Sequence, residues 1–222
     1  MPYRSVNPAT GEVITTFANH TDAELQSALS VAHALYKSDW SNGPIQPRIE
    51  VLSRLADLLD CRTEELARVL TQEMGKRISE ARSEVQLTAE IARFYAANAA
   101  TFLASTRIQT PQGDAWVEYH PIGIIVAGEP WNFPYYQLVR VAGPNIAIGN
   151  PVLAKHASIV PRAAVAFAEL VTEAAEGSQR IAEAGSNIGA GAVIEEVGAE
   201  GLVLALAGGV GGREELGGLR VR

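Results

Sequence analysis

The spacing of apolar residues over the first hundred positions predicts a layer of amphipathic helices. Apolar side chains recur three and four residues apart, which places them on one face of a helix. The helical segments cover residues 25–36, 49–59, 66–70 and 79–104. Thr21 and Glu24 form a capping-box pattern at the start of the first helix, and Gly75 ends the third. Residues 13–17 predict a short extended segment before this layer.

The pattern changes to the shorter period of strands after residue 105. Residues 106–109 and 115–120 flank a turn at Gln112–Asp114, so we expect them to pair as a hairpin. The run Ile122–Ala127 is apolar throughout, which predicts a strand that is buried on both faces.

Two helices and a second strand follow that run. Pro134 can begin a helix because the first N–H of a helix has no partner, and this helix extends toward Gly149. Residues 151–154 form the next strand, and Pro161 opens a helix that ends near Thr172. Strand, helix and strand at this spacing form a βαβ unit. The predicted class is therefore α/β, with a parallel sheet behind the helical layer.

Composition divides the chain near residue 173 and excludes several classes of function. Residues 174–222 hold 12 of the 20 glycines and lack proline, lysine, histidine, cysteine, methionine and aromatic residues. The net charge of −7 argues against nucleic acid as a partner. A single cysteine excludes a disulfide framework and a multi-thiolate metal site. The apolar runs are too short to span a membrane and no signal peptide is evident, so we expect a cytoplasmic protein.

Ligands of a parallel sheet bind beyond the carboxyl ends of its strands, which are here residues 127–132 and 155–158. In the first segment, Asn132 stands between Pro130 and Pro134, which restrict the backbone. Its side-chain amide donates two N–H bonds and could stabilise a developing oxyanion. Alternatively, Asn132 caps the helix that begins at Pro134.

The second segment holds a lysine, a histidine and a serine. Lys155 could bind a ribose hydroxyl or a phosphate, or it is a solvated lysine at a strand end. Ser158 could cap the helix at Pro161, whose N-terminus attracts anions. His156 is either cationic or simply exposed. No Gly-x-Gly-x-x-Gly motif follows residue 127, so the usual dinucleotide fingerprint is absent from the sequence there.

Five segments of the chain resemble the aldehyde dehydrogenase family. They are Val6–Glu12, Glu73–Lys76, Pro130–Pro134, Gly143–Asn150 and Leu153–Ser158. Their details are most similar to bacterial succinate-semialdehyde dehydrogenases, and the similarity covers residues 3–173 in order. The resemblance implies a Rossmann-like cofactor domain of βαβ units preceded by an N-terminal helical layer, incomplete relative to the family fold.

The resemblance assigns roles to residues at both strand ends. Asn132 would donate its amide to the oxyanion formed during aldehyde oxidation, and Trp131 would line the nicotinamide end of the cofactor. Lys155 would bind the adenosine ribose, with His156 and Ala157 beside it. The implied activity is oxidation of succinate semialdehyde, or a similar aldehyde, to the carboxylic acid with NADP or NAD.

The resemblance also bears on cofactor preference and on assembly. Many NAD-preferring relatives carry a glutamate where Ser158 stands, and that carboxylate repels a 2′-phosphate. We therefore expect NADP to bind at least as readily as NAD. Residues 106–120 would belong to the hairpin arm through which subunits pair, which predicts a homo-oligomer.

The cysteine departs from the family pattern. The family's nucleophile is a cysteine well downstream of Lys155, whereas the chain's single cysteine is Cys61, between two predicted helices. A catalytic thiol needs an electropositive site, and only Arg62 adjoins Cys61 in sequence, so we interpret it as a structural residue. We expect an N-terminal fragment that is inactive alone or, alternatively, a non-catalytic nucleotide-binding or subunit-pairing module.

The tail after residue 173 contains three segments similar to family motifs. Gly208–Gly209 follows the apolar run 201–207, where the family has a Gly-Ser turn, and Gly185–Ser186 resembles that turn without a strand before it. Glu215 stands in a copy of the segment around the family's general base, but it arrives too early. It is a displaced base or a chance match, and the tail is a degenerate family segment or unrelated sequence.

Overall fold

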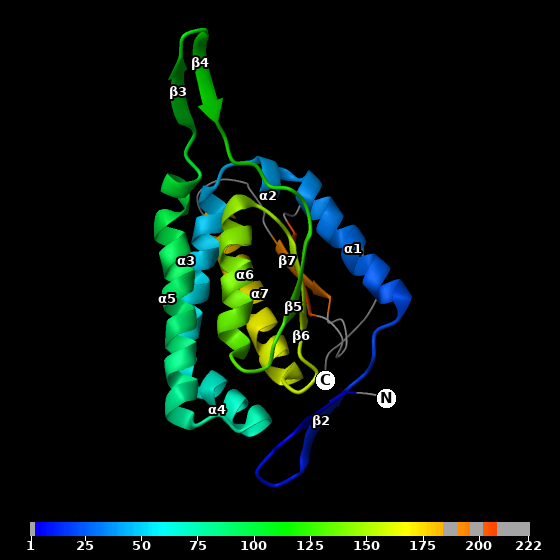
Figure 1. Ribbon diagram of the computed structural model, residues 1–222. Helices are drawn as coiled ribbons and strands as arrows, with labels where there is room; N and C mark the ends of the chain where they lie inside the picture. Colours follow the sequence, from blue (N-terminus) through cyan, green and yellow to red (C-terminus); the bar gives the residue numbers. More distant parts are fainter. Residues whose placement is uncertain (1–2, 184–190, 196–201, 208–222) are drawn as a thin grey trace.

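The predicted helical layer and βαβ unit are both present in the computed structural model, which describes residues 3–183, 191–195 and 202–207, and the side chains of residues 3–177 (Figure 1). The helices are α1 (Asp22–Lys37), α2 (Asp39–Asn42), α3 (Gln46–Cys61), α4 (Thr63–Met74), α5 (Ile78–Phe102), α6 (Pro134–Ile148) and α7 (Pro161–Glu183). The strands are β1 (Tyr3–Val6), β2 (Val13–Phe17), β3 (Thr106–Thr110), β4 (Gly113–Val117), β5 (Ile125–Glu129), β6 (Val152–His156), β7 (Gly191–Glu195) and β8 (Leu202–Ala207).

Local signals set the ends of the N-terminal helices. The hydroxyl of Thr21 accepts from the amide of Glu24 at 3.2 Å, and the amide of Thr21 donates to the Glu24 carboxylate at 2.6 Å. These two bonds confirm the capping box at the start of α1. Gly75 ends α4 with a φ of 75°, a left-handed conformation that glycine adopts without strain. The segment predicted to be extended is β2, which pairs antiparallel with β1.

The core lies where α3, α5, α6 and α7 pack together. Helices α5 and α6 approach closely at Gly143, where a Cβ atom would lie 2.7 Å from the ring of Tyr95. Phe167 of α7 is fully buried in the same core. Helix α1 lies across the sheet from α6, and Leu153 of β6 packs with its small side chains (Figure 1). The βαβ unit is therefore held between the helical layer and α1.

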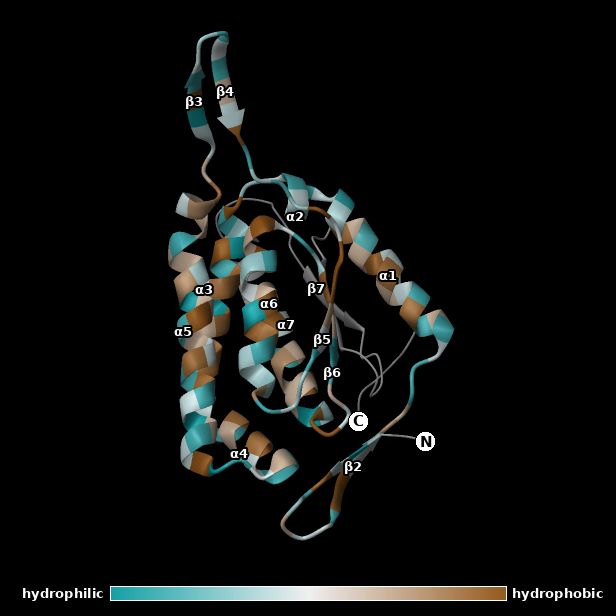
Figure 2. Ribbon diagram, viewed as in Figure 1, coloured by the Kyte–Doolittle hydropathy of each residue, from teal (hydrophilic) through white to brown (hydrophobic). Residues whose placement is uncertain are grey.

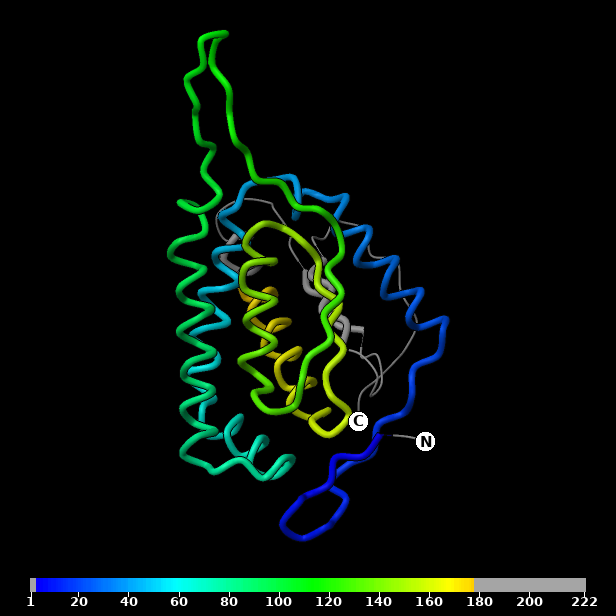
Figure 3. The backbone as a smooth tube through the Cα atoms, viewed as in Figure 1, coloured from blue at the N-terminus to red at the C-terminus, as the bar shows by residue number. Residues whose placement is uncertain are grey.

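The parallel strand pair predicted from the sequence is confirmed. In the register of β5 and β6, Ile125 stands opposite Val152 and Glu129 opposite His156. Figure 3 shows the two strands side by side, each turning back into its helix at the same end. The described sheet has the order β5-β6-β8-β7, and β8 is antiparallel to both of its neighbours. The sheet is therefore mixed, whereas the sequence predicted parallel strands only.

The prediction that Ile122–Ala127 is a strand buried on both faces is wrong. The strand begins only at Ile125, and Ile122 and Val126 are 81% and 75% exposed. Strand β5 is the outermost strand of the described sheet, and the helical core covers only the face that carries the buried Ala127. Figure 2 shows the hydrophobic stretch that leads into β5 with no helix in front of it. An apolar run identifies a strand, but the neighbouring elements decide which faces are covered.

Two further segments extend beyond the core. Helix α7 continues to Glu183, past its predicted end near Thr172 and past the change in composition at residue 173. Strands β3 and β4 form the predicted hairpin, with Thr106 opposite Val117, and project away from the rest of the molecule (Figure 1). The second strand begins at Gly113, inside the predicted turn, and ends at Val117 instead of continuing to residue 120. Within the described residues, no helix combines the length and the apolar character needed to cross a bilayer.

Candidate functional site

The two segments predicted to carry chemistry lie at one edge of the sheet. Gly128 of β5 stands opposite Lys155 of β6 in the parallel register, so the chain leaves both strands at the same edge (Figure 3). Trp131, in the turn after β5, is 52% exposed, and Asn132 is also exposed. The structure thus brings together the segments that the βαβ prediction placed at adjacent strand ends.

His156 connects these two segments. Its side chain is buried, its Nδ1 accepts from the amide of Ala157 at 2.8 Å, and its Nε2 lies 3.1 Å from the carbonyl oxygen of Pro134. Because Nδ1 accepts, Nε2 carries the proton and donates it to Pro134. Burial lowers the pKa of His156, which favours the neutral ring. The expectation of a cationic or exposed histidine is therefore wrong, because the ring holds the end of β6 against the start of α6.

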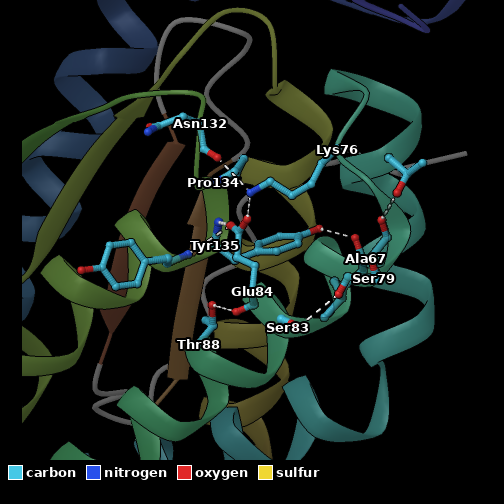
Figure 4. Close-up of polar contacts among 12 residues, drawn as sticks. Ala67, Lys76, Ser79, Ser83, Glu84, Thr88, Asn132, Pro134 and Tyr135 are labelled. Carbon is cyan, nitrogen blue, oxygen red and sulfur yellow. Dashed lines mark hydrogen bonds and ion pairs between the residues drawn. The ribbon is translucent and has the colours of Figure 1, made fainter. Parts of the chain in front are cut away.

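A buried carboxylate holds the start of α6 (Figure 4). Glu84 of α5 accepts from the amides of Tyr135 at 2.9 Å and Tyr136 at 3.4 Å. Amides in the first turn of a helix need acceptors, and a negative charge there also interacts favourably with the helix dipole. The alternative in which Asn132 caps this helix is wrong, since Phe133 is the N-cap and no side chain at that position accepts a bond.

Lys76 completes the support of the turn before α6. Its ammonium forms an ion pair with Glu84, donates to the carbonyl oxygen of Asn132 at 2.9 Å and lies 3.9 Å from the centroid of the Phe133 ring. The side chains of Lys76 and Glu84 are 7% and 0% exposed. Burial raises the pKa of Glu84, and Lys76 opposes this shift. A nearly dry ion pair therefore lies directly against the turn that carries Asn132.

Helix α7 begins with a similar arrangement. Glu73 of α4 accepts from the amides of Arg162 and Ala163, both at 2.9 Å, and its side chain is buried. Burial raises the pKa of Glu73. The prediction that Ser158 caps α7 is wrong, because the helix starts at Pro161 and Ser158 is exposed in the loop before it. Both helices that follow the candidate site are thus anchored by carboxylates from the helical layer.

The remaining predicted site residues are at least partly open to solvent. Lys155 is exposed, with its Nζ 3.4 Å from the carbonyl oxygen of His156. Ser158 is exposed and Ala157 is half-buried. The side-chain amide of Asn132 makes no hydrogen bond with the described part of the chain. A free amide, a cation and a hydroxyl at one edge can together donate to a ligand rich in oxygen atoms.

Other candidates from the sequence lie elsewhere. Cys61 is the last residue of α3 and is exposed, so it belongs to the helical layer and not to the end of a strand. Glu215, Gly208–Gly209 and Gly185–Ser186 lie outside the described residues. In the ranges that the structure describes, no group of three His, Cys, Asp or Glu residues is arranged to hold a metal ion.

Comparison with known proteins decides the family. A family model for aldehyde dehydrogenases matches residues 1–190. The chain belongs to the aldehyde dehydrogenase family. A succinate-semialdehyde dehydrogenase (NADP(+)) of Deinococcus radiodurans is 40% identical to this chain over 173 residues, and a probable one of Synechocystis sp. is 39% identical over 170 residues. The matches cover 78% and 77% of this chain but 36% and 37% of those proteins, so it spans little more than a third of their length.

A solved structure agrees with these relatives. The succinic semialdehyde dehydrogenase of Streptococcus pyogenes, crystallised in complex with NADP+ as the cofactor, is 45% identical and superposes with a TM-score of 0.75. The match covers 78% of this chain and 38% of that one. The family resemblance and the incomplete α/β fold inferred from the sequence are therefore confirmed.

Three residues support the site although the sequence analysis gave them no role there, even where it found the segment Glu73–Lys76 similar to the family. They are Glu73, Lys76 and Glu84, each of which reaches a segment far away in sequence. The sequence does contain one signal for Glu84, which lies three residues after Ala81 and four before Thr88 on the buried face of α5. A carboxylate on an apolar face requires partners, and its position alone could have prompted a search for a cation.

Proposed function

We propose that this chain binds NADP across the carboxyl ends of β5 and β6. It forms the cofactor-facing part of an NADP-dependent aldehyde dehydrogenase that oxidises succinate semialdehyde, or a similar aldehyde, to the carboxylic acid. The observation that carries the proposal is the convergence of residues 131–132 and 155–158 at one sheet edge. The names of the relatives from Deinococcus radiodurans and Streptococcus pyogenes support this cofactor and this aldehyde.

The residues at the edge fit the chemistry of the cofactor. Ribose and phosphate oxygens need N–H and O–H donors, which Asn132, Lys155 and Ser158 present in exposed positions. The segment 155–160 contains no carboxylate, so it brings no negative charge that would repel a 2′-phosphate. The exposed ring of Trp131 offers an apolar surface for the nicotinamide end. NADP should therefore bind at least as well as NAD.

The same site lacks one part of the family's chemistry. The nucleophile that the family resemblance implies is a cysteine thiolate, and the single cysteine of the sequence, Cys61, lies on α3 in the helical layer. We therefore propose that the chain alone binds the cofactor without oxidising the aldehyde. We also place it in the cytoplasm, because a sequence with a single cysteine is compatible with a reducing compartment.

Calorimetric titration of the full chain with NADP and with NAD tests the proposal. Saturable binding of NADP, with NAD no tighter, is expected. Lys155→Met should weaken NADP binding roughly five- to tenfold because it removes a cation from the edge. Lys37→Met, at the end of α1, is the matched control and should leave affinity unchanged. No binding of NADP by a folded chain, or NAD binding much more tightly, would refute the proposal.

The assay for turnover uses the same protein. We expect no NADPH absorbance to develop when NADP and succinate semialdehyde are mixed with the chain alone. A rate near that of a full-length dehydrogenase would contradict the proposed separation of cofactor binding from catalysis.

The projecting hairpin supports a second role, the pairing of subunits. Every residue of β3 and β4 is exposed, including Trp116 at 58% and Ile108 at 46%. Large apolar side chains on an exposed two-stranded ribbon are typical of an interaction surface. We expect a homo-oligomer in light scattering after size-exclusion chromatography, and Trp116→Ser should lower its mass. Val13→Ser, which removes a smaller exposed apolar side chain from β2, is the control, and a wild-type monomer would exclude this role.

A further inference from the structure

A buried lysine, Lys76, contacts the turn between β5 and α6 that carries Asn132. The ammonium of Lys76 pairs with Glu84, donates to the Asn132 carbonyl oxygen at 2.9 Å and lies 3.9 Å from the centroid of the Phe133 ring (Figure 4). An ammonium group has three N–H donors; two acceptors are the Glu84 carboxylate and the Asn132 carbonyl oxygen, and the Phe133 ring lies against the same ammonium. Because the side chain of Lys76 is only 7% exposed, it is placed to act on the turn and not on a ligand.

The covalent structure of the turn leaves Asn132 dependent on such a contact. Pro130 and Pro134 restrict their own φ angles and the residues before them, but they do not restrict Trp131 or Asn132. The side chain of Asn132 is exposed and forms no hydrogen bond with the described residues. Within the same part of the chain, the bond from Lys76 is the one hydrogen bond made to Asn132.

Lys76 is itself held in place by the helical layer. It follows Gly75, which ends α4 in a left-handed conformation, and precedes α5. Glu84, two turns along α5, binds Lys76 with one oxygen and the first amides of α6 with the other. Two residues near the corner between α4 and α5 thus contact two successive segments. Lys76 binds the carbonyl oxygen of Asn132, and Glu84 binds the first amides of α6.

We propose that Lys76, seated on Glu84, is the positioning residue for the Asn132 amide. By holding the carbonyl oxygen of Asn132, it fixes the peptide between Asn132 and Phe133, and hence the direction of the Asn132 side chain. Figure 4 shows that side chain on the side of the turn away from Lys76. The inference rests on the proposed function, in which the amide faces the ligand. An amide already held in place binds without the cost of being ordered.

Nuclear magnetic resonance of the ligand-free chain tests the proposal directly. Selective 15N labelling of asparagine makes each side-chain amide visible, and Asn132→Asp identifies the pair of signals from Asn132 by their loss. In Lys76→Met, the Asn132 signals should broaden or shift toward positions of an unstructured amide. The side-chain amides of Asn145 and Asn150 donate to the carbonyl oxygen of Val141 at 2.8 Å and to Oδ1 of Asn145 at 3.0 Å, so their signals should be unchanged and report an intact fold.

Two variants separate positioning from a general loss of structure. Lys76→Arg keeps a cation with several donors and should restore one sharp pair of Asn132 signals. Arg77→Met removes the neighbouring cation, whose side chain is 79% exposed, and should change nothing. Unchanged Asn132 signals in Lys76→Met would overturn the proposal. Equal changes in the signals of Asn132, Asn145 and Asn150, with no rescue by Lys76→Arg, would also overturn it. Either result would show that Lys76 has no specific effect on Asn132.

Binding provides a second readout. Lys76→Met should weaken NADP affinity roughly tenfold, about 1.4 kcal/mol, which is comparable with the cost of ordering one residue's backbone. If wild-type protein does not bind NADP, the proposed function fails, while the signals of the free protein still decide whether Lys76 positions Asn132. If NADP binds and Lys76→Met changes neither affinity nor signals, the positioning role alone is wrong.

Discussion

Removing Glu84 alone should cost more stability than removing both partners of the Lys76–Glu84 ion pair. In Glu84→Met, the ammonium of Lys76 remains buried without its counter-ion, and the first amides of α6 lose their acceptor. In Lys76→Met, Glu84 keeps those amides, and it can take up a proton because burial already raises its pKa. In the double variant, no charge is left stranded and only the amides remain unpaired.

These differences set the expected magnitudes. Side chains that are 7% and 0% exposed receive almost no screening from solvent. Leaving a buried charge without its counter-ion lowers the free energy of unfolding by about 3–5 kcal/mol, so we expect that loss in Glu84→Met. Lys76→Met should cost about 1–3 kcal/mol. The double variant should cost about 1–3 kcal/mol, the penalty for unpaired amides, and should be more stable than Glu84→Met alone.

Urea unfolding followed by circular dichroism at constant m-value measures all four proteins. The matched control is the ion pair between Arg82 and Glu64, whose side chains are 44% and 57% exposed. Its double-mutant cycle should give a coupling of about 0.2–1 kcal/mol, as exposed pairs do. If the Lys76 and Glu84 losses simply add, within about 0.5 kcal/mol, the two groups are not coupled and the reasoning is refuted.

Three further predictions address the cofactor, the backbone and pH. Ser158→Glu should lower the preference for NADP over NAD roughly tenfold, since a carboxylate near a 2′-phosphate costs about 1–2 kcal/mol in a watery site; an unchanged ratio in paired titrations would place the 2′-phosphate elsewhere. Gly149→Ala should cost about 2–4 kcal/mol, because Gly149 has a φ of 101° and its Cβ would lie 2.9 Å from Cα of Ser41. Gly11→Ala, at a φ of 75° with nothing within 4 Å, should cost only about 1 kcal/mol. Equal losses of stability in the two variants would show that Gly149 does not lie close to Ser41. Because the pKa of His156 is lowered in the folded chain, the unfolded chain binds a proton at a higher pH than the folded chain does. As the pH drops below about 6.5, the free energy of unfolding should therefore decrease by at most about 1.4 kcal/mol per pH unit. His156→Gln should flatten that decline in urea unfolding, and an identical slope would show that the ring is not buried as a neutral group.

The parts of the fold that local rules govern were predictable from the sequence. The capping box at Thr21, the end of α4 at Gly75 and the start of α6 at Pro134 each depend on residues a few positions apart. The parallel pairing of β5 with β6 followed from the βαβ spacing and placed Asn132 and Lys155 at one edge. Local signals therefore located the site, although they did not show what holds it.

The supporting contacts were not predictable because they join distant segments. Capping by a residue within the local sequence is a recognisable motif, but Glu73 and Glu84 cap helices that begin at least fifty positions later. The hydrogen bond between His156 and the carbonyl oxygen of Pro134 likewise joins segments 22 positions apart. The exposure of Val126 depends on which elements cover β5, a property of the assembled sheet.

Hydrogen–deuterium exchange with and without NADP tests most directly whether the two strand ends form one cofactor site. NADP should slow exchange in peptides spanning residues 128–134 and 155–160 together, while peptides from the projecting hairpin at residues 106–117 remain unchanged. Protection of only one of the two segments, or binding of NADP that protects neither, would contradict it.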